Sequence, residues 1–230
     1  MSEQRIKDLW IVLQSGILLA LLVLSVLRGA HRIAAVVIAG VGLASFTFLY
    51  LSSAEKLTRA ANLVTALRLV TSVGVFLYIV VRGEGAIGYT LFLLLIGIET
   101  TDFIDGYLAK RTGPTPFGAT WDMEADAFFL FLLSFIAHFI FGLGAWVLLI
   151  GAIRYIFAFV FTVLPRPSVY PRVFRLFAKS VCVYAVLALI SLTAPFLSPL
   201  LGRGLAAAAT VLLAVSFLWE LGLGLREQRG

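Results

Sequence analysis

The chain has 230 residues, of which 61% are hydrophobic and 13% are charged, and its mean hydropathy is +1.05. A soluble domain of this length cannot bury so many apolar side chains, so the composition excludes a soluble globular protein and indicates a polytopic membrane protein. The net charge of +6 does not indicate a nucleic-acid partner, because the basic residues are spread over the loops without interleaved aromatic residues. The single cysteine, Cys182, lacks the partners that a disulfide or a thiolate metal site requires.

Eight apolar segments are long enough to cross a hydrocarbon layer of about 30 Å. We therefore predict an all-α fold of about eight transmembrane helices, surrounded by membrane lipids. The segments are residues 10–27, 33–51, 63–81, 87–109, 117–141, 145–164, 176–197 and 203–222. The first segment is interpreted as a retained helix rather than a signal peptide, because the residues before it are of mixed charge and a second span follows at once.

The basic residues predict how these spans are oriented. With eight spans, 12 of the 18 Lys and Arg residues lie on the side of both termini, four lie on the opposite side and two fall within spans. Cytoplasmic loops of membrane proteins carry the excess of Lys and Arg. We therefore expect both termini to be cytoplasmic, together with the loop between the fourth and fifth spans.

Acidic residues are concentrated in residues 99–126, which hold six of the 12 in the chain. Carboxylates at the edge of a bilayer are energetically unfavourable, so they indicate a functional site. On helices, Asp102 and Asp105 share one face, as do Asp122 and Asp126, because residues three or four apart are neighbours. The connecting stretch KRTGPTP has the composition of a turn. A helical hairpin can therefore bring all four carboxylates together.

Four clustered carboxylates repel one another unless cations lie between them. Hard oxygen ligands of this kind suit Mg²⁺ or Mn²⁺. We therefore predict a site for two divalent ions formed by Asp102, Asp105, Asp122 and Asp126. Sites with two metal ions stabilise a phosphoryl group between its attacking and leaving oxygens.

Three small residues, Gly106, Ala109 and Gly118, each stand one helical turn from one of these aspartates. They leave bare backbone beside the carboxylates, against which a flat group such as a nucleotide could lie. Small residues also let transmembrane helices pack closely, which is the alternative explanation for each of them. Their shared register with the aspartates favours the nucleotide.

Together these residues form the pattern D-x-x-D-G-x-x-A followed by G-x-x-x-D-x-x-x-D, which resembles the signature of the CDP-alcohol phosphatidyltransferases, membrane enzymes of phospholipid biosynthesis. The chain has Lys110 where the family has Arg, and its spacing from there to Gly118 is one residue shorter. The stretch NLVTALRL at 62–69 is similar to the start of the family's first core helix. The resemblance implies a six-helix core at 56–230, preceded by an added pair of helices at 1–55.

The resemblance also implies an activity. A phosphatidyl group would pass from a CDP-linked lipid donor to an alcohol acceptor, with release of CMP. The four aspartates would hold two divalent ions on the donor pyrophosphate, and Asp126 would also be the general base for the acceptor hydroxyl. Gly106, Ala109, Lys110 and Gly118 would line the nucleotide pocket. The family further implies a homodimer.

Further polar residues are candidates for the same site. Asn62, Thr65 and Arg68 recur every three residues and face one way. They could contact the nucleotide or the phosphates, or they could cap and anchor the helix. Arg154, near the middle of its span, needs an ion pair or a phosphate contact. Glu124 points off the face that carries the aspartates and is expected to pair with a basic residue.

A basic triplet, Arg172, Arg175 and Lys179, repeats at helical spacing. It could bind an anionic acceptor or a lipid headgroup, or it could be an ordinary cytoplasmic anchor. We favour CDP-diacylglycerol as donor, and the triplet favours glycerol 3-phosphate or another anionic acceptor. The alternative enzyme transfers from CDP-choline or CDP-ethanolamine to diacylglycerol. Outside enzymes, a divalent-cation transporter would explain the aspartates but not the small residues beside them.

Overall fold

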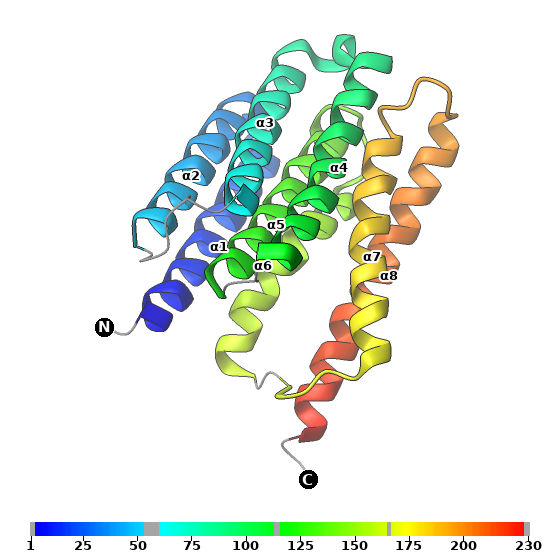
Figure 1. Cartoon of the computed structure of the whole chain (residues 1–230). Coiled ribbons are helices and arrows are strands. Elements are labelled where there is room, and N and C mark those ends of the chain that lie inside the picture. The colour runs from blue at the N-terminus through cyan, green and yellow to red at the C-terminus, as the bar shows by residue number, and fades with distance from the viewer. Residues whose placement is uncertain (1–2, 53–59, 113–115, 165–166, 228–230) are drawn as a thin grey trace.

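The structure, a computed structural model, describes residues 3–52, 60–112, 116–164 and 167–227 (Figure 1). Within the helices, the side chains of residues 3–8, 50–52, 60–61, 103, 105–112 and 116 lie outside this description. Helices are the only regular secondary structure in the described part of the chain. The helices are α1 (Glu3–Arg28), α2 (His31–Ser52), α3 (Ala60–Arg82), α4 (Tyr89–Thr112), α5 (Pro116–Phe139), α6 (Leu148–Val163), α7 (Arg172–Ser191) and α8 (Pro199–Glu227), with short 3-10 turns η1 (Gly83–Ala86) and η2 (Ala145–Val147).

Each predicted span corresponds to one helix, so the predicted all-α fold is confirmed. The largest difference is at the seventh span, predicted at 176–197 and observed as Arg172–Ser191. The helix starts earlier because it includes Arg172 and Arg175, which the hydropathy pattern had left outside. It ends earlier because the chain turns before Pro195, whose ring cannot continue a helical hydrogen-bond ladder.

Six helices of the described chain, α1, α2, α3, α6, α7 and α8, are long and apolar enough to cross a membrane. The other two, α4 and α5, carry the acidic residues of the window 99–126. A polytopic bundle of this composition is typical of an integral membrane protein.

The central helix of the bundle is α5, which packs against α2, α3, α6 and α7. Every residue from 127 to 137 is buried. Two glycines let neighbouring helices approach it closely. A Cβ on Gly42 of α2 would lie 2.2 Å from the Phe128 ring, and one on Gly151 of α6 would lie 2.5 Å from the Phe131 backbone. The position of α5, and of the acidic residues on its first turns, is therefore fixed by packing on several sides.

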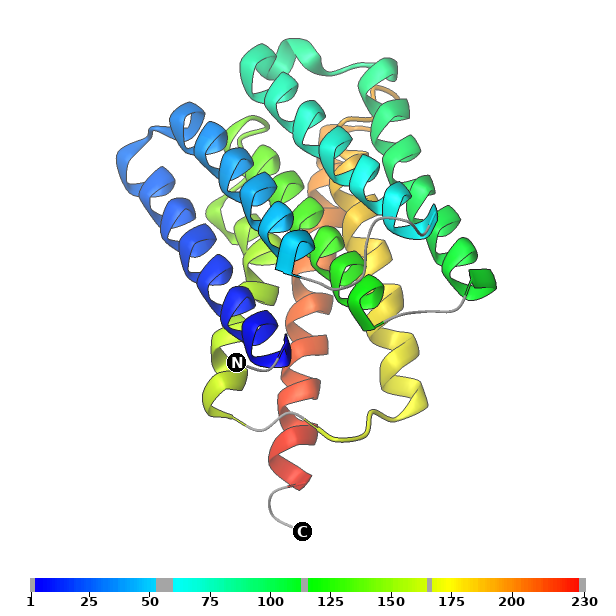
Figure 2. The ribbon, with the colours of Figure 1, turned by 60° about the vertical axis from the view of Figure 1, so that its left-hand side comes forward.

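The first two helices pack against each other and then against the rest of the bundle (Figure 2). Helix α1 contacts α6, and α2 contacts α3 and α5. Trp10 donates its indole N–H to the Ser45 carbonyl at 3.0 Å, and the Ser45 hydroxyl donates to Gln14 Oε1 at 2.8 Å. These partly buried polar contacts join α1 to α2 as one unit that covers one side of the bundle.

The start of α1 and the end of α8 lie at the same end of the bundle, as Figure 1 shows. The end of α4 and the start of α5 are also at this end, as are the start of α3 and the start of α7. The acidic window therefore faces the same side as the two termini.

Candidate active site

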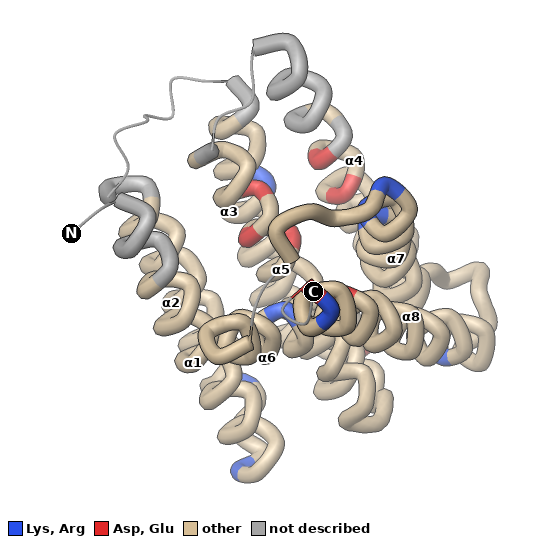
Figure 3. Tube along the Cα trace, turned by 90° about the horizontal axis from the view of Figure 1, so that it is seen from below, with Lys and Arg blue, Asp and Glu red and all other residues tan. Residues whose placement is uncertain are grey.

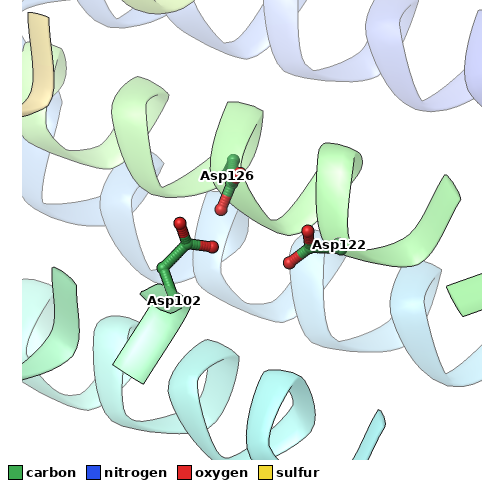
Figure 4. Close-up of side chains that lie close together, drawn as sticks. All are labelled: Asp102, Asp122 and Asp126. Carbon is green, nitrogen blue, oxygen red and sulfur yellow. The ribbon is translucent and has the colours of Figure 1, made fainter. Parts of the chain in front are cut away.

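Three of the four predicted metal ligands meet at this end of the bundle. Asp102 lies in α4, while Asp122 and Asp126 lie one turn apart in α5, and their side chains point toward one another (Figure 4). One carboxylate oxygen from each residue lies within 4.8 Å of those from the other two. The side chains are 28%, 39% and 49% exposed, respectively. The cluster is therefore open to a ligand from outside.

The counter-ion of this cluster is Arg68 from α3. Its guanidinium forms an ion pair with Asp102, and it lies 2.8 Å from a carboxylate oxygen of Asp122 and 2.8 Å from one of Asp126. The Arg68 side chain is only 5% exposed. The sequence pattern had suggested Arg68 as a phosphate or acceptor ligand, whereas the structure gives it three carboxylate partners. A third helix thus contributes to the site.

Other residues of α3 lie on the same side. Asn62 and Thr65 are both buried, about two turns and one turn before Arg68. The amide nitrogen of Asn62 has no hydrogen-bond partner within the described part of the chain. Leaving such a buried donor unpaired is unfavourable by about 1–3 kcal/mol. Asn62 is therefore a group whose hydrogen bond a ligand can complete.

Four further candidates, Asp105, Gly106, Ala109 and Lys110, lie in the last turns of α4. Their side chains are outside the described residues, so the structure places only their helix, which is the one that carries Asp102. Gly118 lies in α5, one turn before Asp122. The two halves of the sequence pattern are thus carried by two successive helices.

A second, separate ion pair joins α5 to α6. The Nη2 of Arg154 lies 2.5 Å from Oε1 of Glu124. The Glu124 side chain is 2% exposed and that of Arg154 is 23% exposed. The prediction that Glu124 pairs with a basic residue is confirmed, and Arg154 has the ion-pair partner that its position in a span requires. Because Glu124 lies between Asp122 and Asp126 in sequence but off their face, this pair fixes the rotation of α5 about its axis.

The basic triplet lies on the first turns of α7, where Arg172, Arg175 and Lys179 are exposed. Figure 3 shows basic residues of α7 and acidic residues of α4 and α5 at the same end of the bundle. Helix α7 packs against both α4 and α5. The triplet is therefore positioned beside the cluster, although no contact joins the two sets among the described residues.

The donor set fits a divalent cation. Oxygens bound to one Mg²⁺ at about 2.1 Å are at most about 4.2 Å apart, so small side-chain rotations would bring the three carboxylates onto one ion. Carboxylate oxygens are also the ligand type that Mg²⁺ and Mn²⁺ prefer. Among the described side chains, these three acids face one arginine, Arg68, so the four groups together carry an excess of negative charge, which a divalent cation would neutralise.

The protein-family model described as CDP-alcohol phosphatidyltransferase matches residues 58–219, well over half of the chain. The match includes the three clustered aspartates and Arg68. The chain belongs to the CDP-alcohol phosphatidyltransferase family. It is therefore a membrane phosphotransferase of phospholipid biosynthesis, in which a phosphatidyl group passes from a CDP-alcohol donor to an alcohol acceptor. No curated protein and no solved structure matches the chain. Helices α1 and α2 lie before the matched region.

Proposed function

We propose that this enzyme transfers a phosphatidyl group from CDP-diacylglycerol to a small alcohol and releases CMP. The observation that supports the proposal is the convergence of Asp102, Asp122 and Asp126 at one end of a membrane bundle, within the region matched by the family model. The cluster is partly exposed and surrounded by apolar helices. It is therefore suited to a substrate whose nucleotide is polar and whose two acyl chains are not.

Divalent ions, Mg²⁺ or Mn²⁺, are proposed to be held by Asp102, Asp105, Asp122 and Asp126, where they would neutralise the charge of the donor pyrophosphate. We expect two ions, as the sequence analysis indicated. The contribution of the chain itself is to hold these carboxylates in a fixed arrangement. It does so by packing α5 on several sides and by the ion pair between Glu124 and Arg154.

The proposed general base is Asp126, the most exposed of the three clustered carboxylates. It would accept the proton of the acceptor hydroxyl as the hydroxyl oxygen bonds to the phosphorus that carries diacylglycerol. The bond between this phosphorus and the bridging oxygen of the pyrophosphate breaks, and that oxygen leaves as part of CMP. A base positioned in this way contributes about 10²–10⁴-fold to the rate.

The nucleotide is proposed to lie against Gly106, Ala109 and Gly118, with Lys110 near its phosphates. Asn62 and Thr65 would contact it from α3. The unpaired amide nitrogen of Asn62 supports this assignment, because an acceptor atom of the ligand would satisfy it.

The acceptor is proposed to be anionic, with glycerol 3-phosphate as the first candidate. Arg172, Arg175 and Lys179 support this choice, because they are exposed on α7 at the end of the bundle that carries the aspartates. Arginine binds phosphate through two parallel hydrogen bonds. Arg154 is now assigned to the ion pair with Glu124 rather than to the acceptor.

Three further expectations about the whole chain belong with this proposal. The bias of basic residues supports a cytoplasmic location for the site and both termini, which lie at one end of the bundle. Residues 1–55 are proposed to be an added helical pair and residues 56–230 the catalytic core. A homodimer is expected from the family.

The test is release of CMP by the purified protein, supplied with CDP-diacylglycerol, Mn²⁺ or Mg²⁺ and one alcohol at a time. Glycerol 3-phosphate is compared with uncharged glycerol. CMP release that is faster with the anionic alcohol supports the proposal. Release only from CDP-choline or CDP-ethanolamine with diacylglycerol would reverse the roles of donor and acceptor. No CMP from any donor, with uptake of Mn²⁺ into vesicles, would instead establish a cation transporter.

A matched pair of variants controls this assay. Asp122→Asn removes one carboxylate charge from the cluster and is expected to abolish CMP release. Glu84→Gln removes an exposed carboxylate charge from η1, which follows α3 at the opposite end of the bundle, and is expected to leave the rate unchanged. Equal loss in both variants would mean that total charge rather than the cluster is responsible.

A further inference from the structure

Arg68 lies where a cation would bind. Its guanidinium contacts Oδ1 of Asp102, Oδ1 of Asp122 and Oδ1 of Asp126. These side chains come from two helices, and Arg68 comes from a third. Among the described side chains, one guanidinium faces three carboxylates, so these four groups together carry two formal negative charges. One divalent ion would neutralise this charge.

The guanidinium and a divalent ion cannot both bind these oxygens without conflict. Both are positive, and like charges about 4 Å apart repel each other strongly at the effective dielectric constant of a protein. Arg68 is 5% exposed, so solvent screens this repulsion little. Arginine also stays protonated at any physiological pH, so it cannot relieve the repulsion by losing its proton.

We propose that Arg68 is an exchangeable counter-ion. It holds the carboxylates of α4 and α5 together in the metal-free protein, and it gives up at least part of these contacts when a divalent cation binds. The inference rests on the metal site of the proposed function. It adds that Arg68 lowers the affinity of the site for the cation and stabilises the carboxylate cluster in the metal-free protein.

The geometry favours arginine for this purpose. The planar fork of its guanidinium offers several donors, so one side chain bridges acids on two helices. Without it, Asp102 on α4 would repel Asp122 and Asp126 on α5, and the two helix ends would separate. The Arg68 backbone is a regular part of α3, where its carbonyl accepts a hydrogen bond from the Ser72 hydroxyl at 2.7 Å, so the proposed exchange requires no change of the helix. Only the side chain has to move.

The test is thermal unfolding of the full-length protein in detergent, measured first with EDTA and then during titration with Mn²⁺. Arg68→Gln is expected to unfold at a lower temperature than the wild type in EDTA. The same variant is expected to bind Mn²⁺ at least about tenfold more tightly, because one repelling charge has been removed. The two effects have opposite signs, which a purely structural role of Arg68 would not produce.

The matched control is Arg82→Gln, which removes an exposed arginine from the last turn of the same helix, α3, and leaves the aspartate cluster intact. It should change neither the unfolding temperature in EDTA nor the affinity for Mn²⁺. Arg68→Lys is the second test variant, to be used if Arg68→Gln does not fold. It keeps the charge and loses the planar fork, so its affinity for Mn²⁺ should stay within about threefold of the wild type.

Two results would overturn the inference, and they are distinguishable. An affinity for Mn²⁺ that is unchanged or weaker in Arg68→Gln, with a normal response of the wild type, refutes the exchange and leaves the proposed function standing. A wild-type protein whose unfolding does not respond to Mn²⁺ or Mg²⁺ refutes the metal site itself, and with it both the exchange and the metal dependence of the proposed function.

Discussion

Replacing either member of the ion pair between Glu124 and Arg154 should destabilise the protein, and replacing both should not. Glu124→Leu leaves the Arg154 guanidinium without its carboxylate, and the Nε of Arg154 already lacks a hydrogen-bond partner among the described residues. Breaking a buried pair by removing one partner costs about 3–5 kcal/mol. Arg154 is 23% exposed, so water recovers part of this and we expect a loss of about 2–3 kcal/mol.

The loss can be measured as a shift in unfolding temperature. For a chain of this size, 1 kcal/mol corresponds to about 2–4 °C, so Glu124→Leu and Arg154→Met should each lower the midpoint by about 4–12 °C. The double variant should recover most of this, because two apolar side chains of similar volume replace the pair. Intrinsic tryptophan fluorescence is a suitable probe, since Trp10 and Trp121 are both buried. A thiol-reactive dye is not, because Cys182 is exposed before unfolding.

The result of this experiment decides whether the ion pair between Glu124 and Arg154 fixes the position of α5. If each single variant shifts the midpoint by less than about 2 °C, the pair does not fix α5 and the reasoning is refuted. If the double variant is less stable than either single variant, the contribution lies in packing rather than in charge compensation, and the same conclusion follows. Comparing the two single variants with the double variant separates packing from charge compensation, because Glu124 and Arg154 contact each other directly.

Other perturbations test the site and the packing around it. Asp126→Asn should lower CMP release at least about 10²-fold while binding of CDP-diacylglycerol remains measurable, and a wild-type rate would remove Asp126 as the base. Gly151→Ala should lower the free energy of unfolding by about 1–3 kcal/mol, because its Cβ would meet the Phe131 backbone. Gly97→Ala is the control, and it should be neutral or slightly stabilising because there is open space around its Cβ. Arg175→Gln should raise the KM for an anionic acceptor and leave the KM for CDP-diacylglycerol unchanged; an equal rise in both would place Arg175 outside the acceptor site.

Much of the fold could be predicted because hydropathy alone determines which segments enter a bilayer. Every predicted span became a helix. The ends were less predictable, since they depend on local chemistry. Arg172 is helical although it is charged, and the seventh helix ends ahead of a proline-containing turn rather than where the apolar run ends.

The site was partly predictable for a related reason. Spacing on one helix determines which residues share a face, so the shared face of Asp122 and Asp126 followed from the sequence. Their convergence with Asp102 followed as well, because only a short connection separates the two helices. Contacts with side chains from helices that are distant in the sequence could not be predicted in this way. The spacing of Asn62, Thr65 and Arg68 suggested a face toward the site, but it did not indicate that Arg68 pairs with the aspartates of α4 and α5. The choice of Arg154 as the partner of Glu124 was likewise not indicated. Such pairings depend on tertiary packing, which a single sequence does not reveal.

The enclosure of α5 has a consequence for self-association. Helices from the same chain surround it, and α6 in turn is contacted by α1 and α8 as well as by α5. A second subunit therefore finds this part of the molecule already occupied, and the dimer expected of the family would have to form along other, outward-facing helices. Removing the first two helices would expose a new apolar surface, and the oligomeric state of this enzyme would then depend on a segment that lies outside the matched catalytic region.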